Sequence, residues 1–246
     1  MIASWQVRDA SISEWLDADT MDPRDLQRNL RDIRRINALL GWTAFTTHAV
    51  LSALRGQPHR AWSLLDVASG SADIPIAIAR AATRAKVNLR VTATDRNPQI
   101  VGVARDQSAG IDSVTVEQQD ALALPYPNGS FDIALCTLAL HHFAPDVAVL
   151  LLRSMARVGR RVMVYDVVRS PLAYAGVVAM TRLGRMHPMT CHDGPASVRR
   201  AYSAAEVRAL AAKAGLTNAQ VQVGFPFRLM LTADGTASTA GGSDAI

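Results

Sequence analysis

The chain has few cysteines, few aromatic residues and no long apolar run. Its two cysteines among 246 residues exclude a disulfide framework, which favours a reducing, cytoplasmic setting. No apolar run approaches the roughly 18 residues of a membrane span, and residues 1–10 lack the basic and apolar regions of a secretory signal. We therefore expect a cytoplasmic protein without a membrane span.

Lysine is also scarce, and this changes how the positive charge is interpreted. The formal net charge is +5, but Lys86 and Lys213 are the only lysines, and the arginines are scattered among Asp and Glu. Aromatic residues make up 5% of the chain, and no basic patch is interleaved with them as in sites for single-stranded nucleic acid. We therefore expect a small-molecule partner and no nucleic acid.

The sequence is rich in alternating apolar runs and helical patterns. Strands are predicted at residues 63–67, 89–94, 113–117, 131–138 and 161–167, and helices at 74–85, 98–107, 145–158, 171–183 and 204–214. Two last runs, 219–223 and 227–231, are predicted to form a hairpin. This alternation predicts an α/β fold with a doubly wound, seven-stranded sheet that is mostly parallel and ends in an antiparallel hairpin.

The predicted sheet divides the chain into three parts. Residues 1–58 hold two helical patterns before the first strand, so we expect an N-terminal helical cap or lid. Residues 59–231 form the main domain, with an insert at about 171–203 that is expected to cover the substrate. Residues 232–246 are small and polar, which predicts a disordered tail.

The strongest local signal follows the first predicted strand. Asp66 ends the apolar run, and Val67-Ala68-Ser69-Gly70-Ser71-Ala72 comes next. Such a turn exposes main-chain N–H groups to a ligand, and Ser71 or Asp73 could cap the following helix. Because the turn holds one glycine, the Gly-x-Gly-x-x-Gly fingerprint of nicotinamide enzymes is absent.

Two more acids follow the next two predicted strands. Asp95 ends the second strand, and Asp120-Ala121 follows the third. Doubly wound sheets bind ligands at the carboxyl ends of their strands, so Asp66, Asp95 and Asp120 are expected at one ligand-binding edge. The alternatives are an ordinary strand-to-helix turn at Asp66, a helix cap at Asp95 and an exposed loop acid at Asp120.

These motifs resemble those of the class I S-adenosylmethionine (SAM)-dependent methyltransferases over roughly residues 60–231. The resemblance implies a Rossmann-like domain that binds SAM and releases S-adenosylhomocysteine. Asp66 and its turn would hold the methionine end, Asp95 the ribose hydroxyls and Asp120 the adenine amino group. Ala68 and Ala72 replace two of the family's usual glycines, and alanine resists positive φ. The cofactor-binding residues that the resemblance implies are Asp66, Ala68, Ser69, Gly70, Ala72, Asp95, Arg96, Asp120, Ala121 and Thr137.

A pair of histidines follows the fourth predicted strand. Leu140-His141-His142 resembles a Leu-His-His segment of methyltransferases that act on quinones, phenols and polyketides. A phenol is a poor nucleophile until its proton leaves, so His141 or His142 is expected to be the general base. The alternative is a packed or capping histidine. Adjacent histidines do not easily share one ion, so no metal is expected.

The fifth predicted strand is followed by two further polar candidates. Asp166 and Arg169 lie at the same expected edge. Asp166 could orient a histidine or bind the acceptor, and Arg169 could steady a phenolate or carboxylate. A surface ion pair is the alternative for both residues.

The segment 187–203 gives a second, more specific resemblance. It is similar to a His-x-Asp-Gly-Pro-x-Ser-Val-Arg-x-Ala-Phe pattern found in a subgroup that accompanies type III polyketide synthases, and Arg34-Arg35-Ile36-Asn37 is similar as well. This resemblance makes His192 and Asp193 rival base candidates, and we assign Asn37, Arg169 and Asp193 to acceptor binding. A structured loop held by Gly194-Pro195 is the alternative.

Together these patterns predict a methyltransferase that acts on a small, apolar aromatic hydroxyl compound. We expect the acceptor to be a phenol, a quinol or a polyketide of secondary metabolism, with O-methylation favoured over C-methylation. The chain is expected to be a monomer or a homodimer. The alternatives are a SAM-binding protein that transfers no methyl group and an RNA methyltransferase, although no Asp-Pro-Pro-Tyr-like segment of nucleic-acid amino methylases is present.

Overall fold

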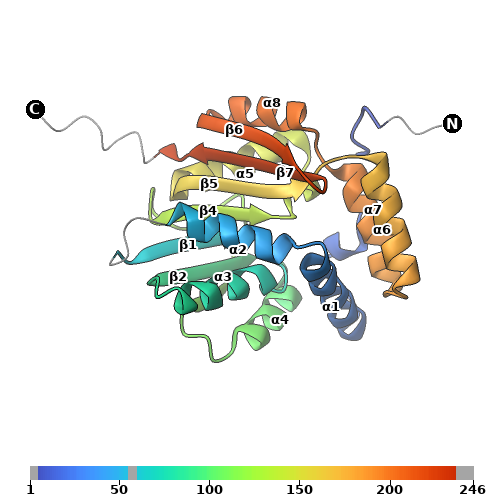
Figure 1. The fold of residues 1–246 in the computed structure, drawn as a ribbon, viewed down its shortest axis with the longest axis horizontal. Helices are drawn as coiled ribbons and strands as arrows, with labels where there is room; N and C mark the ends of the chain where they lie inside the picture. Colours follow the sequence, from blue (N-terminus) through green and yellow to red (C-terminus); the bar gives the residue numbers. More distant parts are fainter. Residues whose placement is uncertain (1–4, 55–59, 237–246) are drawn as a thin grey trace, which may run out of the picture.

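One seven-stranded sheet organises the protein (Figure 1). The computed structural model describes residues 5–54 and 60–236. The spatial order of the strands is β3-β2-β1-β4-β5-β7-β6, and β7 runs antiparallel to both of its neighbours. The predicted mostly parallel sheet with a C-terminal antiparallel hairpin is therefore confirmed. The strands are β1 (Trp62–Val67), β2 (Leu89–Asp95), β3 (Val114–Gln118), β4 (Phe131–Thr137), β5 (Gly159–Val167), β6 (Thr217–Gly224) and β7 (Arg228–Asp234).

Helices cover both faces of this sheet. In β1, Leu64 and Leu65 are both fully buried but face opposite helical layers. This burial on two faces explains why the strand is a continuous apolar run. One layer consists of α2 (Trp42–Ala53), α3 (Asp73–Arg84) and α4 (Pro98–Ser108), and the other of α5 (Pro145–Val158) and α8 (Ala204–Ala214).

The position of α2 corrects the expected N-terminal lid. Trp42, Val50 and Leu54 are buried in the same apolar cluster as Leu64 and Ile78. This helix therefore belongs to a layer of the main domain and does not cap it. The helical pattern does not show which surface a helix packs against, so it could not distinguish a lid from a core helix.

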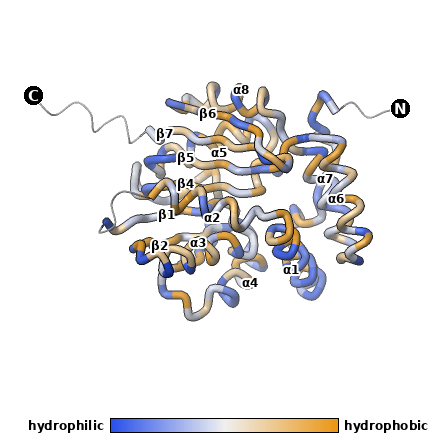
Figure 2. The backbone as a smooth tube through the Cα atoms, viewed as in Figure 1, coloured by the Kyte–Doolittle hydropathy of each residue, from blue (hydrophilic) through white to orange (hydrophobic). Residues whose placement is uncertain are grey.

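A third group of helical elements lies beyond the carboxyl ends of the parallel strands (Figure 1). In Figure 2, α1 is mostly blue, and its apolar residues Leu26 and Leu30 are buried against Ile100 of α4. Among residues 5–54 and 60–236, no helix is both long and apolar enough to cross a membrane. The elements of this group are η1 (Trp15–Asp17), α1 (Pro23–Leu39), η2 (Leu140–His142), α6 (Pro171–Leu183) and α7 (Pro188–Arg200).

Helix α7 lies where the sequence predicts no helix, between the predicted helices at 171–183 and 204–214. Gly194 and Pro195 discourage a helix because proline lacks the N–H that an internal position donates. In the structure Pro195 lies inside α7, and His187 caps the helix by accepting a hydrogen bond from the Met189 N–H at 3.4 Å. Packing of α7 against α6, α1 and η1 outweighs the local preference.

The C-terminal strand also extends further than expected. β7 continues to Asp234, which pairs with Arg161 of β5, so residues 232–234 are not part of a disordered tail. Residues 232–234 extend the backbone ladder between β7 and β5, which their small, polar composition did not reveal. The rest of the predicted tail, residues 237–246, lies outside the described residues.

Candidate active site

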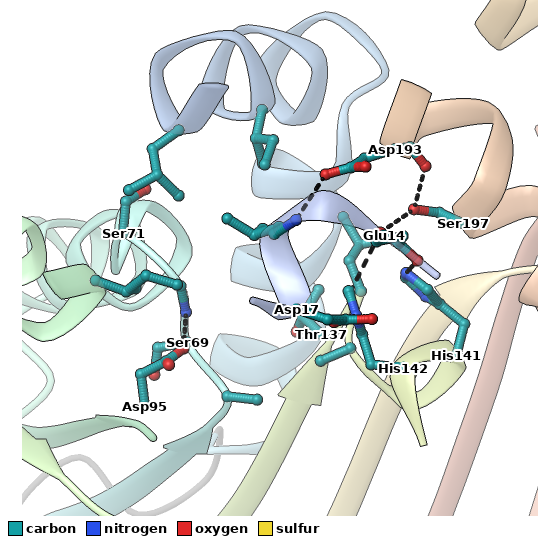
Figure 3. A pocket seen from close by; sticks show the side chains of 18 of the residues that line it. Glu14, Asp17, Ser69, Ser71, Asp95, Thr137, His141, His142, Asp193 and Ser197 are labelled. Atoms are coloured by element: carbon teal, nitrogen blue, oxygen red, sulfur yellow. Dashed lines mark hydrogen bonds and ion pairs between the residues drawn. The ribbon is translucent and has the colours of Figure 1, made fainter. Parts of the chain in front are cut away.

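A cavity of about 620 Å³ opens at the carboxyl edge of the sheet. Its floor comes from the ends of β1, β2 and β4, and its walls from η1, α1 and α7. Figure 3 shows Ser69, Ser71 and Asp95 on one side of this space and the two histidines with Glu14 on the other. The predicted edge is therefore hollow and carries two separate groups of polar side chains.

The turn after β1 alternates between ordinary and left-handed backbone. Ala68, Gly70 and Ala72 have φ angles of 56°, 57° and 59°. Alternation of this kind points successive N–H groups toward one side, which suits a polar or anionic ligand group. Both alanines thus adopt the conformation that alanine resists, and each stores about 1 kcal/mol of strain.

Hydrogen bonds from β2 hold this turn in place. Ser69 Oγ donates to the Asp66 carbonyl at 2.9 Å and accepts from the Thr94 N–H at 2.9 Å. The Gly70 N–H donates to Asp95 Oδ2 at 3.0 Å. The Ala72 side chain is fully buried among apolar residues and does not line the cavity, whereas Ala68, Ser69, Gly70 and Ser71 of the turn do.

Asp66 is a buried acid with an unsatisfied oxygen. Its side chain lines the cavity at 2% exposure, and Oδ1 has no hydrogen-bond partner among the described residues. Burial raises the pKa of Asp66 to about 8; the Ser69 hydrogen bond lowers it, and Asp73 and Asp95 raise it. A buried carboxyl group in this state lacks a cationic partner.

The pKa values of two neighbouring acids are also raised by burial. Burial raises the pKa of Asp73, although Asn37 Nδ2 donates to its Oδ2 at 3.1 Å. Burial also raises the pKa of Asp95, although the N–H groups of Asn97 and Gly70 donate to it. Three acids with raised pKa values therefore surround one turn, and a ligand that carries positive charge would relieve all of them.

The remaining cavity-lining candidates sit around the same side. Asp120 is exposed, and one of its oxygens accepts from the Leu122 N–H at 2.9 Å, while Ala121 is buried beside it. Arg96 pairs with Asp19 at 3.5 Å. Thr137 Oγ1 is buried with no partner in the described chain. These residues line the cavity together with Asp66 and Asp95, as the sequence predicts.

The other side of the cavity holds a histidine cluster, which consists of His141, His142, Glu14, Asp17 and Asp166. His141 is buried, and its Nδ1 lies 2.8 Å from Asp166 Oδ1. His142 Nδ1 lies 2.6 Å from Asp17 Oδ1. Glu14 lies between the two rings, with oxygens 3.7 Å from His141 Nε2 and 3.8 Å from His142 Nε2. Figure 3 shows this convergence.

The carboxylates of the cluster favour the protonated form of His142. Burial alone lowers the pKa of His142, but Glu14 and Asp17 together raise it to about 9. The ligand atoms of Glu14, His141 and His142 lie within 4.8 Å of one another, a spacing that also resembles a metal site. Arg200 already lies 3.3 Å from Glu14 and 2.6 Å from Asp17. Because its guanidinium neutralises these carboxylates, the cluster favours a protonated histidine over a metal ion.

The comparisons with known proteins agree on one protein family. A family model described as a methyltransferase domain matches residues 64–161. A demethylmenaquinone methyltransferase of Thermus thermophilus is 30% identical over 160 residues, which cover 62% of this chain and 69% of that protein. The chain belongs to the SAM-dependent methyltransferases. The expected class I family and its cofactor, SAM, are therefore confirmed.

Other relatives of this methyltransferase match over shorter shares of their length. A demethylmenaquinone methyltransferase of Deinococcus radiodurans is 36% identical over 98 residues, 39% of this chain and 37% of that protein. The ubiquinone/menaquinone biosynthesis C-methyltransferase UbiE of Burkholderia vietnamiensis is 30% identical over 139 residues, 56% of this chain and 54% of that protein. The chain thus spans between about a third and a half of these two relatives. None of the three supports the polyketide-associated subgroup.

A solved structure agrees at the level of the fold. A SAM-dependent methyltransferase from Aquifex aeolicus superposes with a TM-score of 0.60 at 16% identity, and covers 87% of this chain and 98% of that one. The fold of the methyltransferase is thereby shown. SAM carries an ammonium group and a sulfonium, so the buried acids with raised pKa values around the turn fit this cofactor.

Some predicted site residues of the methyltransferase lie outside the cavity. Asp166 is not a lining residue; it accepts from His141 and so orients that ring. His192 stacks on Trp15 at 4.5 Å between ring centroids and does not face the cavity. Arg169 is committed to the carbonyls of Trp5 and Ala201 and to the carboxylate of Glu206. We therefore correct the expectations that His192 is a base and that Arg169 binds the acceptor.

Two predicted acceptor-binding residues line the cavity but already form hydrogen bonds within the protein. Asn37 lines the cavity and donates to Asp73. Asp193 also lines it, but its two oxygens accept from the N–H groups of Trp15 and Leu16 at 2.8 and 3.0 Å. The Asp193 carboxylate therefore fastens the N-terminal segment, which leaves it little capacity to bind an acceptor.

No sequence pattern points to two members of the histidine cluster. Glu14 and Asp17 lie in a short segment without periodicity, far along the chain from the histidines that they contact. Their role depends on the path that the N-terminal segment takes across the carboxyl edge, and no local pattern specifies that path.

Proposed function

We propose that this methyltransferase transfers the SAM methyl group to a small, largely apolar aromatic acceptor with a hydroxyl group. The observation that carries the proposal is the histidine cluster, which faces the same cavity as the acidic turn. Apolar side chains wall the space between them. They include Leu16, Leu30, Ile33, Leu40, Leu138 and Val198.

We assign the acidic side of the cavity to the cofactor. Asp66 would pair with the ammonium group, which would satisfy its free oxygen. Asp95 accepts from the ribose hydroxyls with the lone pairs that its two backbone donors leave free. Asp120, beside Ala121, would accept from the adenine amino group, and Thr137 Oγ1 offers a further polar atom to the cavity.

The histidine cluster removes the acceptor's proton. The Asp166 carboxylate fixes the His141 ring with Nδ1–H as the donor, so His141 Nε2 is left as the proton acceptor toward the cavity. His142, held as an imidazolium, stabilises the negative charge that develops on the acceptor oxygen. A positioned base of this kind contributes roughly 10²- to 10⁴-fold to the rate.

The relatives change the expected position of methylation. The sequence favours O-methylation, but UbiE is named a C-methyltransferase, so we propose a quinol whose ring carbon is methylated. Loss of the hydroxyl proton to His141 spreads negative charge onto the ring carbon beside the oxygen. That carbon attacks the methyl group, the carbon–sulfur bond breaks and S-adenosylhomocysteine leaves. The ring carbon then releases its own proton, and aromaticity is restored.

Incubation with methyl-labelled SAM and a panel of phenols, naphthols and reduced quinones tests the proposal. We expect label in a reduced quinone, with the carbon chemical shift of a ring-bound methyl group. His141→Asn should lower kcat at least 100-fold without changing the SAM dissociation constant, whereas His192→Asn is the matched control and should change kcat less than twofold. SAM binding without label transfer to any member would contradict the proposal and favour a non-methylating SAM-binding protein.

A further inference from the structure

Part of the active site is supplied from outside the matched methyltransferase domain. Residues 5–17, which we name the strap, run across the carboxyl edge of the sheet. The strap is tied to α7 by Asp193, which accepts from Trp15 and Leu16, and by an Asp9–Arg199 ion pair at 2.7 Å. It is tied to η2 by Arg8, which donates to the His141 carbonyl at 2.7 Å. The strap is therefore fixed on both sides of the histidines.

These ties place Glu14 in a closely defined position. Its side chain is buried to 5% exposure, and Ser197 Oγ donates to Oε2 at 2.9 Å. Arg200 lies 3.3 Å from Oε1. The two Nε2 atoms of His141 and His142 lie 3.7 and 3.8 Å from the two carboxylate oxygens. One carboxylate from the strap therefore faces both histidines at once.

Each histidine has a carboxylate at both of its ring nitrogens. His142 has Asp17 at Nδ1 and Glu14 at Nε2, so the charged ring is favoured at both ends. His141 has Asp166 at Nδ1, and its Nε2, like that of His142, faces Glu14 at a distance too long for a hydrogen bond. A hydroxyl group of the acceptor can fill that gap.

The charged groups around Glu14 come from several elements. Arg200 and Asp193 face it from α7, the two histidines from η2 and Asp17 from its own segment. Burial lowers the pKa of His142, the charge of Glu14 is the largest single interaction that raises it, Asp17 raises it further through both a hydrogen bond and its charge, and Arg200 lowers it. Asp95 of β2 also interacts with His142 across the cavity.

We propose that Glu14 is a positioning residue that holds His142 as the imidazolium. With Glu14 in place, the charged His142 ring stabilises the acceptor's oxygen beside His141, which the proposed function assigns as the proton acceptor. This inference rests on the proposed function for the role of the acceptor, but the protonation of His142 itself needs no acceptor. Docking of the strap thereby supplies the negative charge that holds this proton.

The test is Glu14→Gln in the full chain, which removes the charge and keeps the shape. We expect the ring resonances of His142 in an NMR pH titration to show a titration midpoint at least one pH unit lower than in the parent protein. The alkaline limb of the kcat–pH profile should move to lower pH by a similar amount, and kcat at pH 9 should fall about fivefold. The KM for SAM should stay within twofold, because the acidic turn is untouched.

Asp132→Asn is the matched control, because it removes a carboxylate that pairs with Arg60 and does not line the cavity. It should leave the His142 midpoint and the kcat–pH profile in place. Glu14→Asp keeps the charge one methylene further away, and should restore part of both quantities even if Glu14→Gln is poorly folded by circular dichroism. Unchanged His142 titration in Glu14→Gln, or an equal loss in Glu14→Gln and Glu14→Asp, would overturn the proposal. If the titration shifts but no panel member is methylated, the proposed function fails and the role of Glu14 in the protonation of His142 stands.

Discussion

Replacement of Asp66 by asparagine should separate stability from cofactor binding. The pKa of Asp66 in the folded protein is about 8, whereas an unfolded aspartate titrates near 3.9. Between these values the folded state holds a proton that the unfolded state has lost, so the free energy of unfolding falls as pH rises from about 4 to 8. The stability that protonation supports is complete below pH 4 and is lost by pH 8.

The size of this effect follows from the two pKa values. A difference of about four pH units at 1.36 kcal/mol per unit gives a loss on the order of 5 kcal/mol between pH 4 and pH 8 in the absence of SAM. Asp66→Asn carries no ionisable proton there, so this contribution disappears from its stability curve. The variant should therefore be more stable than the parent at pH 8 and should still lose most of its SAM affinity.

Urea denaturation from pH 4 to 8, with and without SAM, measures the first effect, and calorimetry measures the second. Binding of SAM to the parent at pH 7 should release a proton, which shows as a dependence of the binding enthalpy on the buffer's ionisation enthalpy. Asp132→Asn is the control, because Asp132 pairs with Arg60 at the opposite end of β4 and lies outside the cavity. Parallel pH curves for Asp66→Asn and the parent, or undiminished SAM binding by the variant, would refute the reasoning.

Two other substitutions test the cofactor side of the cavity. Asp95→Ala should weaken SAM binding at least tenfold by calorimetry, because it removes the ribose acceptor and the partner of the Gly70 N–H; equal affinity would contradict the ribose assignment. Ala68→Gly should raise the free energy of unfolding by up to about 1 kcal/mol in urea, because it relieves left-handed strain. Ala72→Gly should be neutral or destabilising, because it also empties a fully buried methyl position; a larger gain for Ala72→Gly than for Ala68→Gly would show that strain does not govern this turn.

The sequence predicted the sheet because its strands are buried on both faces. A strand such as Leu64–Val67 must be continuously apolar, and the acid at its carboxyl end stands out against that run. For the same reason the sequence alone places Asp66, Asp95 and Asp120 at one edge of the sheet. The acidic side of the cavity is therefore built from residues beside the strand ends, and local patterns reveal it.

The acceptor side could not be predicted in the same way. Helix α7 forms despite Pro195, because contacts with α1, α6 and η1 outweigh a local penalty. Glu14 reaches the histidines only through the docking of the strap on Asp193. Such contacts join distant segments, and neither periodicity nor composition encodes them.

The origin of Glu14 affects how function can be transferred among relatives. The family model matches residues 64–161, and this stretch holds both histidines but ends before Asp166 and begins after Glu14. Two enzymes that share this stretch can therefore bind the same cofactor and still handle protons differently. To sort such enzymes by acceptor chemistry, one must also compare the residue that the N-terminal segment places between the two imidazoles.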